Sequence, residues 1–173
     1  LAGVSVVITD VLGVERLAPL FFVSPNQINF RVPDPATQGS SFSGYSVQIE
    51  VLAGDGTRSV GELTPVDVAP GFFTANGSGA GLPVGLVVRV RANGTQTVEP
   101  LFTNQNGSVV PKPVDWGAAN ERIFLTLFTT GLRNVADPNG DDNLRENVRV
   151  LLNGYEVIPT FVGSAPGLRG VEQ

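Results

Sequence analysis

The densest group of oxygen-bearing side chains is the segment DPNGDDNLRE. Within it Asp137, Asn139 and Asp141 alternate along the chain, a spacing that lets a loop wrap carboxylate and amide oxygens around Ca²⁺. The EF-hand template is not met, because Asp142 replaces its sixth-position glycine and Val148 replaces its twelfth-position glutamate. Two interpretations stay open: a calcium loop formed by those three side chains, or the solvated tip of a hairpin, which we favour.

Two other features could contact or carry a sugar. Trp116 is the single tryptophan and could stack on a sugar ring, although a lone Trp in a β-sandwich more often packs against the edge of the core. Asn76, Asn93 and Asn106 each begin an Asn-Gly-Ser/Thr triplet, which fits an N-glycosylation acceptor. Turn chemistry explains the triplets without a sugar, so their glycosylation stays open.

The sequence contains few of the residue types that enzymes use for catalysis. The 173 residues include no His and no Cys, which excludes zinc fingers, haem ligation, Cys or Ser–His nucleophiles and disulfide frameworks. Paired carboxylates or a Ser–Lys pair remain. The one lysine, Lys112, is flanked by prolines without an S-x-x-K pattern, and the acidic residues lie mostly at turns. We therefore expect no enzyme, no catalytic residues and no cofactor.

Charge and composition narrow the partners and the compartment. The net charge is −5, so no basic surface exists to bind a phosphate backbone, and we expect no nucleic acid. The longest apolar runs, 17–23 and 82–88, fall far short of the ~20 residues that span a bilayer, and we expect no membrane insertion. The absence of Met and Cys removes the most oxidisable side chains, which suits an extracellular or cell-surface protein. Because Met is absent even at position 1, we expect a processed chain or a segment of a longer one.

Alternating and β-branched segments bounded by Gly, Pro and Asn predict an all-β chain. The predicted strands are Val4–Thr9, Leu20–Val23, Gln27–Val32, Tyr45–Val51, Ser59–Val68, Gly85–Ala92, Thr95–Phe102, Ile123–Thr129, Val148–Leu152 and Tyr155–Val162. Five Asn-Gly pairs supply hairpin turns, because both residues accept a positive φ. Helix is expected only as a turn or two within 115–122.

The small polar stretch 74–82 marks the expected boundary between two units. Short antiparallel strands at this spacing predict tandem Ig-like β-sandwich units, residues 1–73 and 75–173. We expect the first to be incomplete at its N-terminal edge and the second at its C-terminal end. Apolar positions of the clearest strands should form the cores. These are Val6, Ile8, Phe22, Ile28, Phe30, Val47, Ile49, Phe124, Leu125, Leu127, Val150 and Phe161.

The sequence also contains an internal repeat. Residues 4–25, VSVVITDVLGVERLAPLFFVSP, align with residues 148–166, VRVLLNGYEVIPTFVGSAP. Both copies place a V-x-V strand, a glycine turn, an acidic residue, a proline, an aromatic residue and a closing proline in the same order. Two unrelated hairpins could share such residues, but the shared order favours duplication.

Several segments together resemble a known family. They are PLFFVSPNQINFRVP (19–33), VDVAPGFFTANGSGAG (66–81), VRANGTQTVEPLF (90–102), IFLTLFTTGLR (123–133) and VLLNGYEVIPTFVGSAPGLRGVEQ (150–173). They are similar to a C-terminal Ig-like domain of large secreted proteins of Acidobacteria such as Solibacter. The resemblance implies tandem Ig-like modules and secretion, and it implies no catalytic residues. The chain departs from the family at 136–146, an insert that is longer and more acidic than the usual loop.

Two functions from different classes follow. The first is a non-catalytic structural or adhesive module of the cell surface, and the second is a carbohydrate-binding accessory module of a larger secreted protein. We prefer the first, because Tyr45, Trp116 and Tyr155 lie on separate segments and do not predict an aromatic row.

The repeat predicts how copies could associate. The first copy lacks the strand that 123–129 supplies ahead of the second copy, and the second lacks the strands that 27–32 and 45–51 supply after the first. Neighbouring chains could complete each other head to tail into a filament or ring. Alternatively, the missing strands belong to the same polypeptide.

Overall fold

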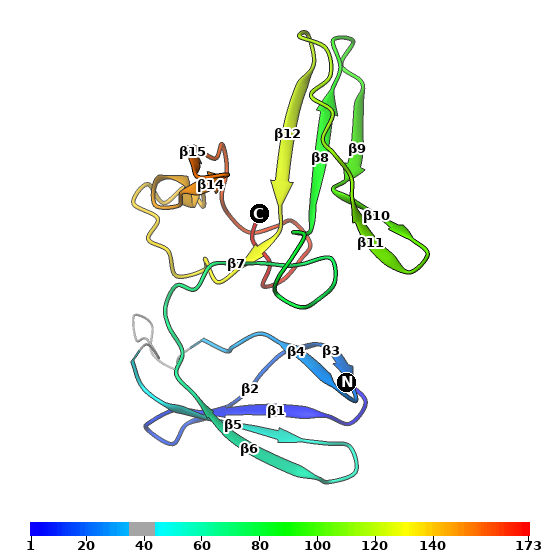
Figure 1. Ribbon diagram of the computed structural model, residues 1–173. Helices are drawn as coiled ribbons and strands as arrows, with labels where there is room; N and C mark the ends of the chain where they lie inside the picture. Colours follow the sequence, from blue (N-terminus) through cyan, green and yellow to red (C-terminus); the bar gives the residue numbers. More distant parts are fainter. Residues whose placement is uncertain (35–43) are drawn as a thin grey trace. The chain divides into compact units, whose positions relative to one another are not determined.

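Short β-branched segments separated by turn residues form antiparallel strands along the whole chain. The structure is a computed structural model, and it describes residues 1–34 and 44–173 (Figure 1). Apart from one 3₁₀ turn, η1 (Leu144–Glu146), every regular element in these ranges is a strand. The prediction of an all-β, antiparallel chain is therefore confirmed. None of the described elements is a helix long and apolar enough to cross a membrane.

The chain divides into two units, Leu1–Asp67 and Val68–Gln173. The boundary lies earlier than the sequence predicts, because residues after Asp67 pair with the second unit. Ala69 donates its backbone N–H to the carbonyl oxygen of Gly131 at 3.0 Å. The polar stretch 74–82 is a loop within the second unit, closed by a bridge between Thr74 and Pro83.

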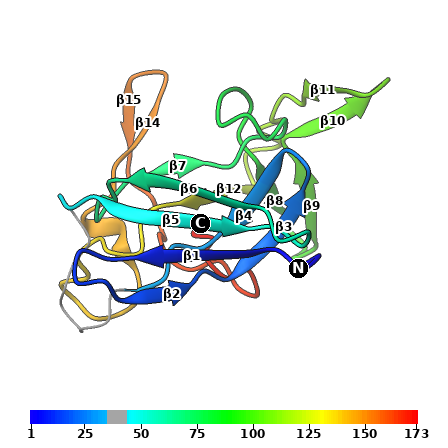
Figure 2. The same ribbon diagram turned by 90° about the horizontal axis from the view of Figure 1, so that it is seen from below.

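The first unit contains a four-stranded sheet and a separate hairpin. Its elements are β1 (Ser5–Thr9), β2 (Glu15–Leu17), β3 (Leu20–Ser24), β4 (Gln27–Phe30), β5 (Val47–Leu52) and β6 (Arg58–Leu63). The sheet order is β2-β1-β5-β6, and β3 pairs with β4 alone. Figures 1 and 2 show the β3–β4 hairpin lying over one face of this sheet.

Alternation along β1 forms the core of this unit. Val6 and Ile8 are fully buried, and Val47 is 2% exposed. Ile8 lies opposite Ile49 and Val6 opposite Val51, so these apolar side chains share one face of the sheet. The face is buried because the β3–β4 hairpin covers it.

The second unit contains one three-stranded sheet and several two-stranded pairs. Its strands are β7 (Gly71–Phe72), β8 (Gly85–Val90), β9 (Gln96–Pro100), β10 (Phe102–Gln105), β11 (Ser108–Pro111), β12 (Arg122–Leu127), β13 (Thr129–Thr130), β14 (Val150–Leu152) and β15 (Tyr155–Val157). The sheet order is β12-β8-β9, and the pairs are β10–β11, β7–β13 and β14–β15. Glu172, the penultimate residue of the sequence, bridges Thr129 on one side and Ser164 on the other.

Burial differs from the sequence prediction. Val6, Ile8 and Val47 are buried as expected, whereas Ile28, Phe30, Ile49, Leu127 and Val150 are half-buried. Phe22, Phe124, Leu125 and Phe161 are exposed, each by more than 40%. Apolar side chains alternate along these strands as the sequence predicts. A side chain becomes buried only where a second layer of chain covers its strand, and many of these strands lack that layer.

The structure also differs from the sequence prediction in the expected helix and in the Asn-Gly turns. Residues 115–122 form no helix; they are an irregular segment that ends in a turn before β12. Two of the five Asn-Gly pairs, at Asn106 and Asn153, form two-residue hairpin loops with both residues at positive φ. Both repeat copies begin with an antiparallel hairpin, β1–β2 and β14–β15. The Ig-like sandwich and the duplication themselves stay predictions.

Replacing Ile8 by Ala should destabilise the first unit. The side chain is fully buried, and truncation leaves a cavity, so we expect the free energy of unfolding to fall by about 2–4 kcal/mol. Val60→Ala on β6, where Val60 is 55% exposed, is the control and should change it by less than about 0.5 kcal/mol. Urea unfolding combined with hydrogen exchange at β1 and β5 measures both. Equal effects of the two variants would contradict the assigned core.

Candidate functional site

The predicted calcium residues lie in the long loop between β13 and β14, where carboxylates stabilise backbone turns. Asp137 accepts the N–H groups of Gly140 and Asp142, one on each carboxylate oxygen, both at 2.9 Å. Asp141 accepts the N–H of Asn143 at 3.1 Å. These bonds are the turn chemistry that short acidic side chains favour. They explain the composition of the loop without an ion.

One asparagine attaches the same loop to the segment after β15, and another closes the loop on itself. Asn143 accepts the N–H of Val162 at 2.9 Å, and Asn147 donates to the carbonyl oxygen of Ala136 at 2.8 Å. Asn139, the asparagine among the three predicted calcium ligands, takes part in neither of these two hydrogen bonds. In the described part of the chain, no three His, Cys, Asp or Glu side chains are grouped to hold a metal ion. A calcium site at Asp137, Asn139 and Asp141 stays a prediction.

The strongest polar cluster in the second unit surrounds Arg89 on β8. Arg89 is only 7% exposed, and its Nη1 donates to Glu121 Oε2 at 2.8 Å. Its Nη2 donates to the backbone carbonyl of Asp115 at 2.6 Å. Glu99 of β9 lies 3.9 Å from Nε and pairs with Lys112. One buried guanidinium therefore fastens the segment 112–121 to the sheet.

Charges in this cluster stabilise one another. The hydrogen bond to Glu121 raises the pKa of Arg89 above its ordinary value. The Lys112 ammonium hydrogen-bonds Glu99 and holds the pKa of that carboxyl below its usual range, with a smaller contribution from Arg89. Both groups thus stay ionised at neutral pH, which keeps the fastening intact.

Trp116 lies within the fastened segment and is 75% exposed. The preceding residue, Asp115, is bound to Arg89 through its backbone, and its carboxylate accepts the N–H of Gly117 at 2.9 Å. Gly117 has a φ of +67°, and a Cβ there would overlap Arg89 and Glu121. The indole is therefore presented to solvent by a turn whose two sides are both fixed.

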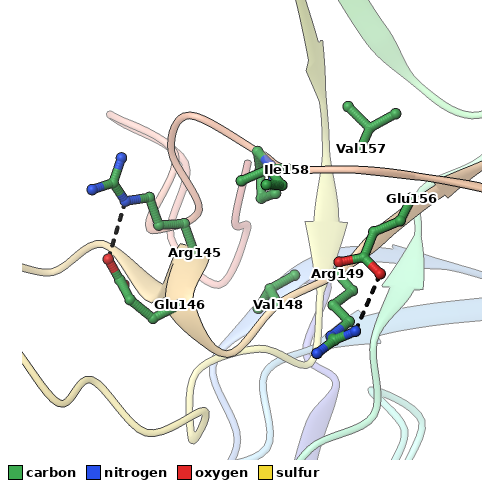
Figure 3. Close-up of a pocket in the computed structure, with 8 residues that line it drawn as sticks. Arg145, Glu146, Val148, Arg149, Glu156, Val157 and Ile158 are labelled. Carbon is green, nitrogen blue, oxygen red and sulfur yellow. Dashed lines mark hydrogen bonds and ion pairs between the residues drawn. The ribbon is translucent and has the colours of Figure 1, made fainter.

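A cleft of about 240 Å³ lies beside the β14–β15 hairpin (Figure 3). Its charged side chains form two ion pairs, Arg145 with Glu146 at 3.0 Å and Arg149 with Glu156 at 3.1 Å. Both lining carboxylates are thus already paired with guanidinium groups.

The three possible glycosylation sites all lie at exposed turns. Asn76 accepts hydrogen bonds from the backbone and hydroxyl of Ser78, and Asn93 accepts the N–H of Thr95 at 3.0 Å. Asn106 forms the first residue of the β10–β11 turn with a φ of +51°. The turn chemistry expected from sequence is present at each site, and glycosylation stays untested.

Two features of the site were missed by sequence reasoning. The buried Arg89 could have been found, because it occupies the inward position of the alternating strand GLVVRV, two residues after the buried Val87. The attachment of residues 112–121 to the sheet could not be found from the sequence. Glu121 and Asp115 are distant from Arg89 along the chain and come close to it only when the chain is folded.

Arg89→Ala should release the Trp116 loop. Without the guanidinium, the Asp115 carbonyl and the Glu121 carboxylate lose their shared donor, so the indole becomes more mobile. Trp116 is the single tryptophan, and its fluorescence anisotropy should fall while acrylamide quenching rises. Arg91→Ala, at the exposed β8–β9 turn, is the matched control and should leave both signals unchanged. An unchanged anisotropy in Arg89→Ala would refute the fastening.

Comparisons with known proteins provide no relative for this arrangement. No protein-family model, no curated protein and no solved structure matches the chain. The function must therefore be inferred from its own residues and geometry.

Proposed function

We propose that the chain is a non-catalytic structural or adhesive module of an extracellular surface, which assembles head to tail with copies of itself. The observation that carries this proposal is a contrast between the two hairpins that begin the repeat copies. The first hairpin, β1–β2, is flanked by a further strand, whereas no further described strand pairs with the second, β14–β15.

In the first copy, β1 pairs on both sides, with β2 and with β5. Its inward residues Val6 and Ile8 are fully buried. In the second copy, β14 pairs with β15 alone. The aligned residues are Val150, which is half-buried, and Leu152, which is 43% exposed. The second hairpin therefore has the sequence of a core element without the strands that would cover it.

The exposed side chains of the second hairpin are mostly large and apolar. On the face that carries Leu152, which is 43% exposed, Tyr155 is 76% exposed and Val157 42%. An isolated two-stranded hairpin is marginally stable in water, and exposed contiguous apolar surface marks an interaction site. A partner that covers this hairpin would stabilise it.

The total surface supports the same conclusion. The chain exposes 11,556 Å². Two separate compact units with the same total mass would expose only about 9,700 Å². The excess indicates faces that are built to be covered.

Composition supports an extracellular surface as the place of assembly. The chain lacks Met and Cys, the most readily oxidised residues, and its net charge of −5 disfavours nucleic acid. Contacts between different faces of successive copies are heterologous, so they propagate into a filament or close into a ring.

Sedimentation velocity over a wide concentration range tests assembly. We expect wild-type chains to form concentration-dependent oligomers, and Leu152→Lys to weaken association at least tenfold by placing a charge on the covered face. Leu151→Lys is the matched control, because Leu151 pairs with Glu156 on the opposite face of the same hairpin. A wild-type monomer at all concentrations, or equal effects of the two variants, would contradict the proposal.

A second candidate function is carbohydrate binding at Trp116. It is supported by the exposed indole, its fixed turn and the neighbouring Asp115 carboxylate, which is 86% exposed and could accept sugar hydroxyl hydrogen bonds. An immobilised aromatic surface loses little entropy on stacking, which favours a sugar ring as its ligand.

Titration with neutral oligosaccharides, followed by Trp116 fluorescence, tests the second candidate. We expect a saturable change in emission, and no binding by Trp116→Ala in calorimetry because the stacking surface is gone. Tyr155→Ala removes an equally exposed aromatic ring and should bind normally. No saturable change with any neutral oligosaccharide tested would count against this function.

A further inference from the structure

One edge of β12 pairs with no described strand and carries few of the charges, prolines or bulges that usually prevent a strand edge from pairing. It is the longest such edge in the second unit. Phe128, just after β12, donates its N–H to the carbonyl of Val84 at 3.0 Å, so the N–H groups of Thr126 and Phe124 also point toward β8. The N–H and C=O groups of Ile123, Leu125 and Leu127 must point the opposite way. No strand in the described residues pairs with that side of β12.

A ladder already begins at one end of this edge. Thr129 donates its N–H to the carbonyl of Glu172 at 2.8 Å and accepts the N–H of Glu172 at 2.9 Å. The bridge is antiparallel. A strand that continues this ladder in the same direction along Leu127, Leu125 and Ile123 would run antiparallel to β12.

The same end contains buried acceptors without donors. Glu172 is 7% exposed, yet its Oε2 has no hydrogen-bond partner, and the hydroxyl of Thr129 is also buried and unpartnered. Such groups are costly unless a donor reaches them. The orphaned acceptors indicate that a polar donor belongs beside the edge.

Natural sheet edges are usually protected by charges, prolines or bulges. The edge strand β6 carries Arg58 and Glu62, and the edge strand β9 carries Glu99 and Pro100. Between Arg122 and its end, β12 carries only Ile, Phe, Leu and Thr. This edge has the composition of a pairing surface.

We propose that β4 of a second copy pairs with this edge, antiparallel to β12. This inference rests on the proposed head-to-tail assembly and adds a strand pairing, at β12 and β4, to the contact that covers the β14–β15 hairpin. The first argument is the order of the repeat. In the second unit, Glu172 follows the second copy and bridges both Ser164 and Thr129, in line with β12. In the first unit, β4 follows the first copy and pairs with β3, and no other described strand pairs with β4.

The second argument is complementarity of the two edges. Arg31 donates its N–H to the carbonyl of Pro19 on the β3 side, so alternation directs the N–H and C=O groups of Ile28 and Phe30 outward. Those outward residues are apolar and half-buried, and β4 contains no charge. Pairing would place Ile28 and Phe30 beside the outward residues of β12.

The pairing also provides a donor for the orphaned acceptors. With Ile28 opposite Leu125, the antiparallel direction brings Asn26, in the β3–β4 turn, toward the Glu172 end of the edge. Its side-chain amide is a hydrogen-bond donor. The contact joins the second unit of one copy to the first unit of the next.

Proline substitutions test the edge without removing its strands. Leu125→Pro deletes an outward N–H of β12 and leaves the donors that bond β8, and proline is tolerated on such an edge. Ile28→Pro does the same for β4. We expect each variant to associate at least tenfold more weakly than wild type in sedimentation. Leu125→Ala and Ile28→Ala keep the N–H groups and should associate more strongly than the matching proline variants.

Mixing the two proline variants provides the decisive measurement. Leu125→Pro chains keep an intact β4 edge, and Ile28→Pro chains keep an intact β12 edge. Because the contact is heterologous, their mixture should form a heterodimer and nothing larger. In wild type, hydrogen exchange at Ile123, Leu125 and Leu127 should slow as concentration rises.

The outcomes separate this inference from the proposed function. Wild-type chains that stay monomeric would overturn both. Wild-type oligomers that persist in the proline variants would overturn only the pairing of β12 with β4. A monomeric mixture would overturn it too, as would protection of the β12 edge that is independent of concentration, because that result shows pairing within one chain. Circular dichroism confirms that both variants remain folded.

Discussion

Backbone hydrogen bonding at open sheet edges is the constraint on which the rest of this structure depends. None of the described sheets closes, so each ends in strands with outward N–H and C=O groups. Water satisfies these groups only where the edge is exposed, and apolar side chains on the same strand then remain exposed as well. On β6 the charges of Arg58 and Glu62 resolve the conflict. Between Arg122 and its end, β12 carries no charged residue, so its outward backbone groups lie beside exposed apolar side chains. This composition leaves the edge suited to pairing with another strand.

The two units show how strongly burial depends on a second layer. Val6 and Val150 occupy aligned positions of the two repeat copies, and both begin hairpins of similar sequence. Val6 is fully buried because β5 pairs beside it and the β3–β4 hairpin lies over it, whereas Val150 is half-buried on β14, which pairs with β15 and with no other described strand. The sequence pattern specifies which side of a strand is apolar. Tertiary structure decides whether that side is covered.

Strand positions were predictable from the sequence, because alternation and turn residues act over a few residues. The Asn106 and Asn153 turns are examples. The exposure of Phe124 and Leu125 was not, since it depends on which distant parts of the chain the fold places over them. The segment 115–122 looked helix-permissive, yet Arg89 fastens it in an irregular path through bonds that span 26 and 32 residues. Local composition contains no trace of such long-range partners.

Trp116 and the β12 edge represent two different ways to present a binding surface. The Trp116 turn is fixed from below by a buried guanidinium, so its geometry exists before any ligand arrives. The β12 edge needs no side-chain support, because its hydrogen-bonding groups are spaced by the strand itself. A strand edge recognises direction and register more than chemical identity, and its selectivity must come from the residues beside it. In the proposed pairing, the buried, unpartnered oxygens of Thr129 and Glu172 would supply that selectivity, because they favour an incoming strand that begins with a polar donor and continues with apolar residues.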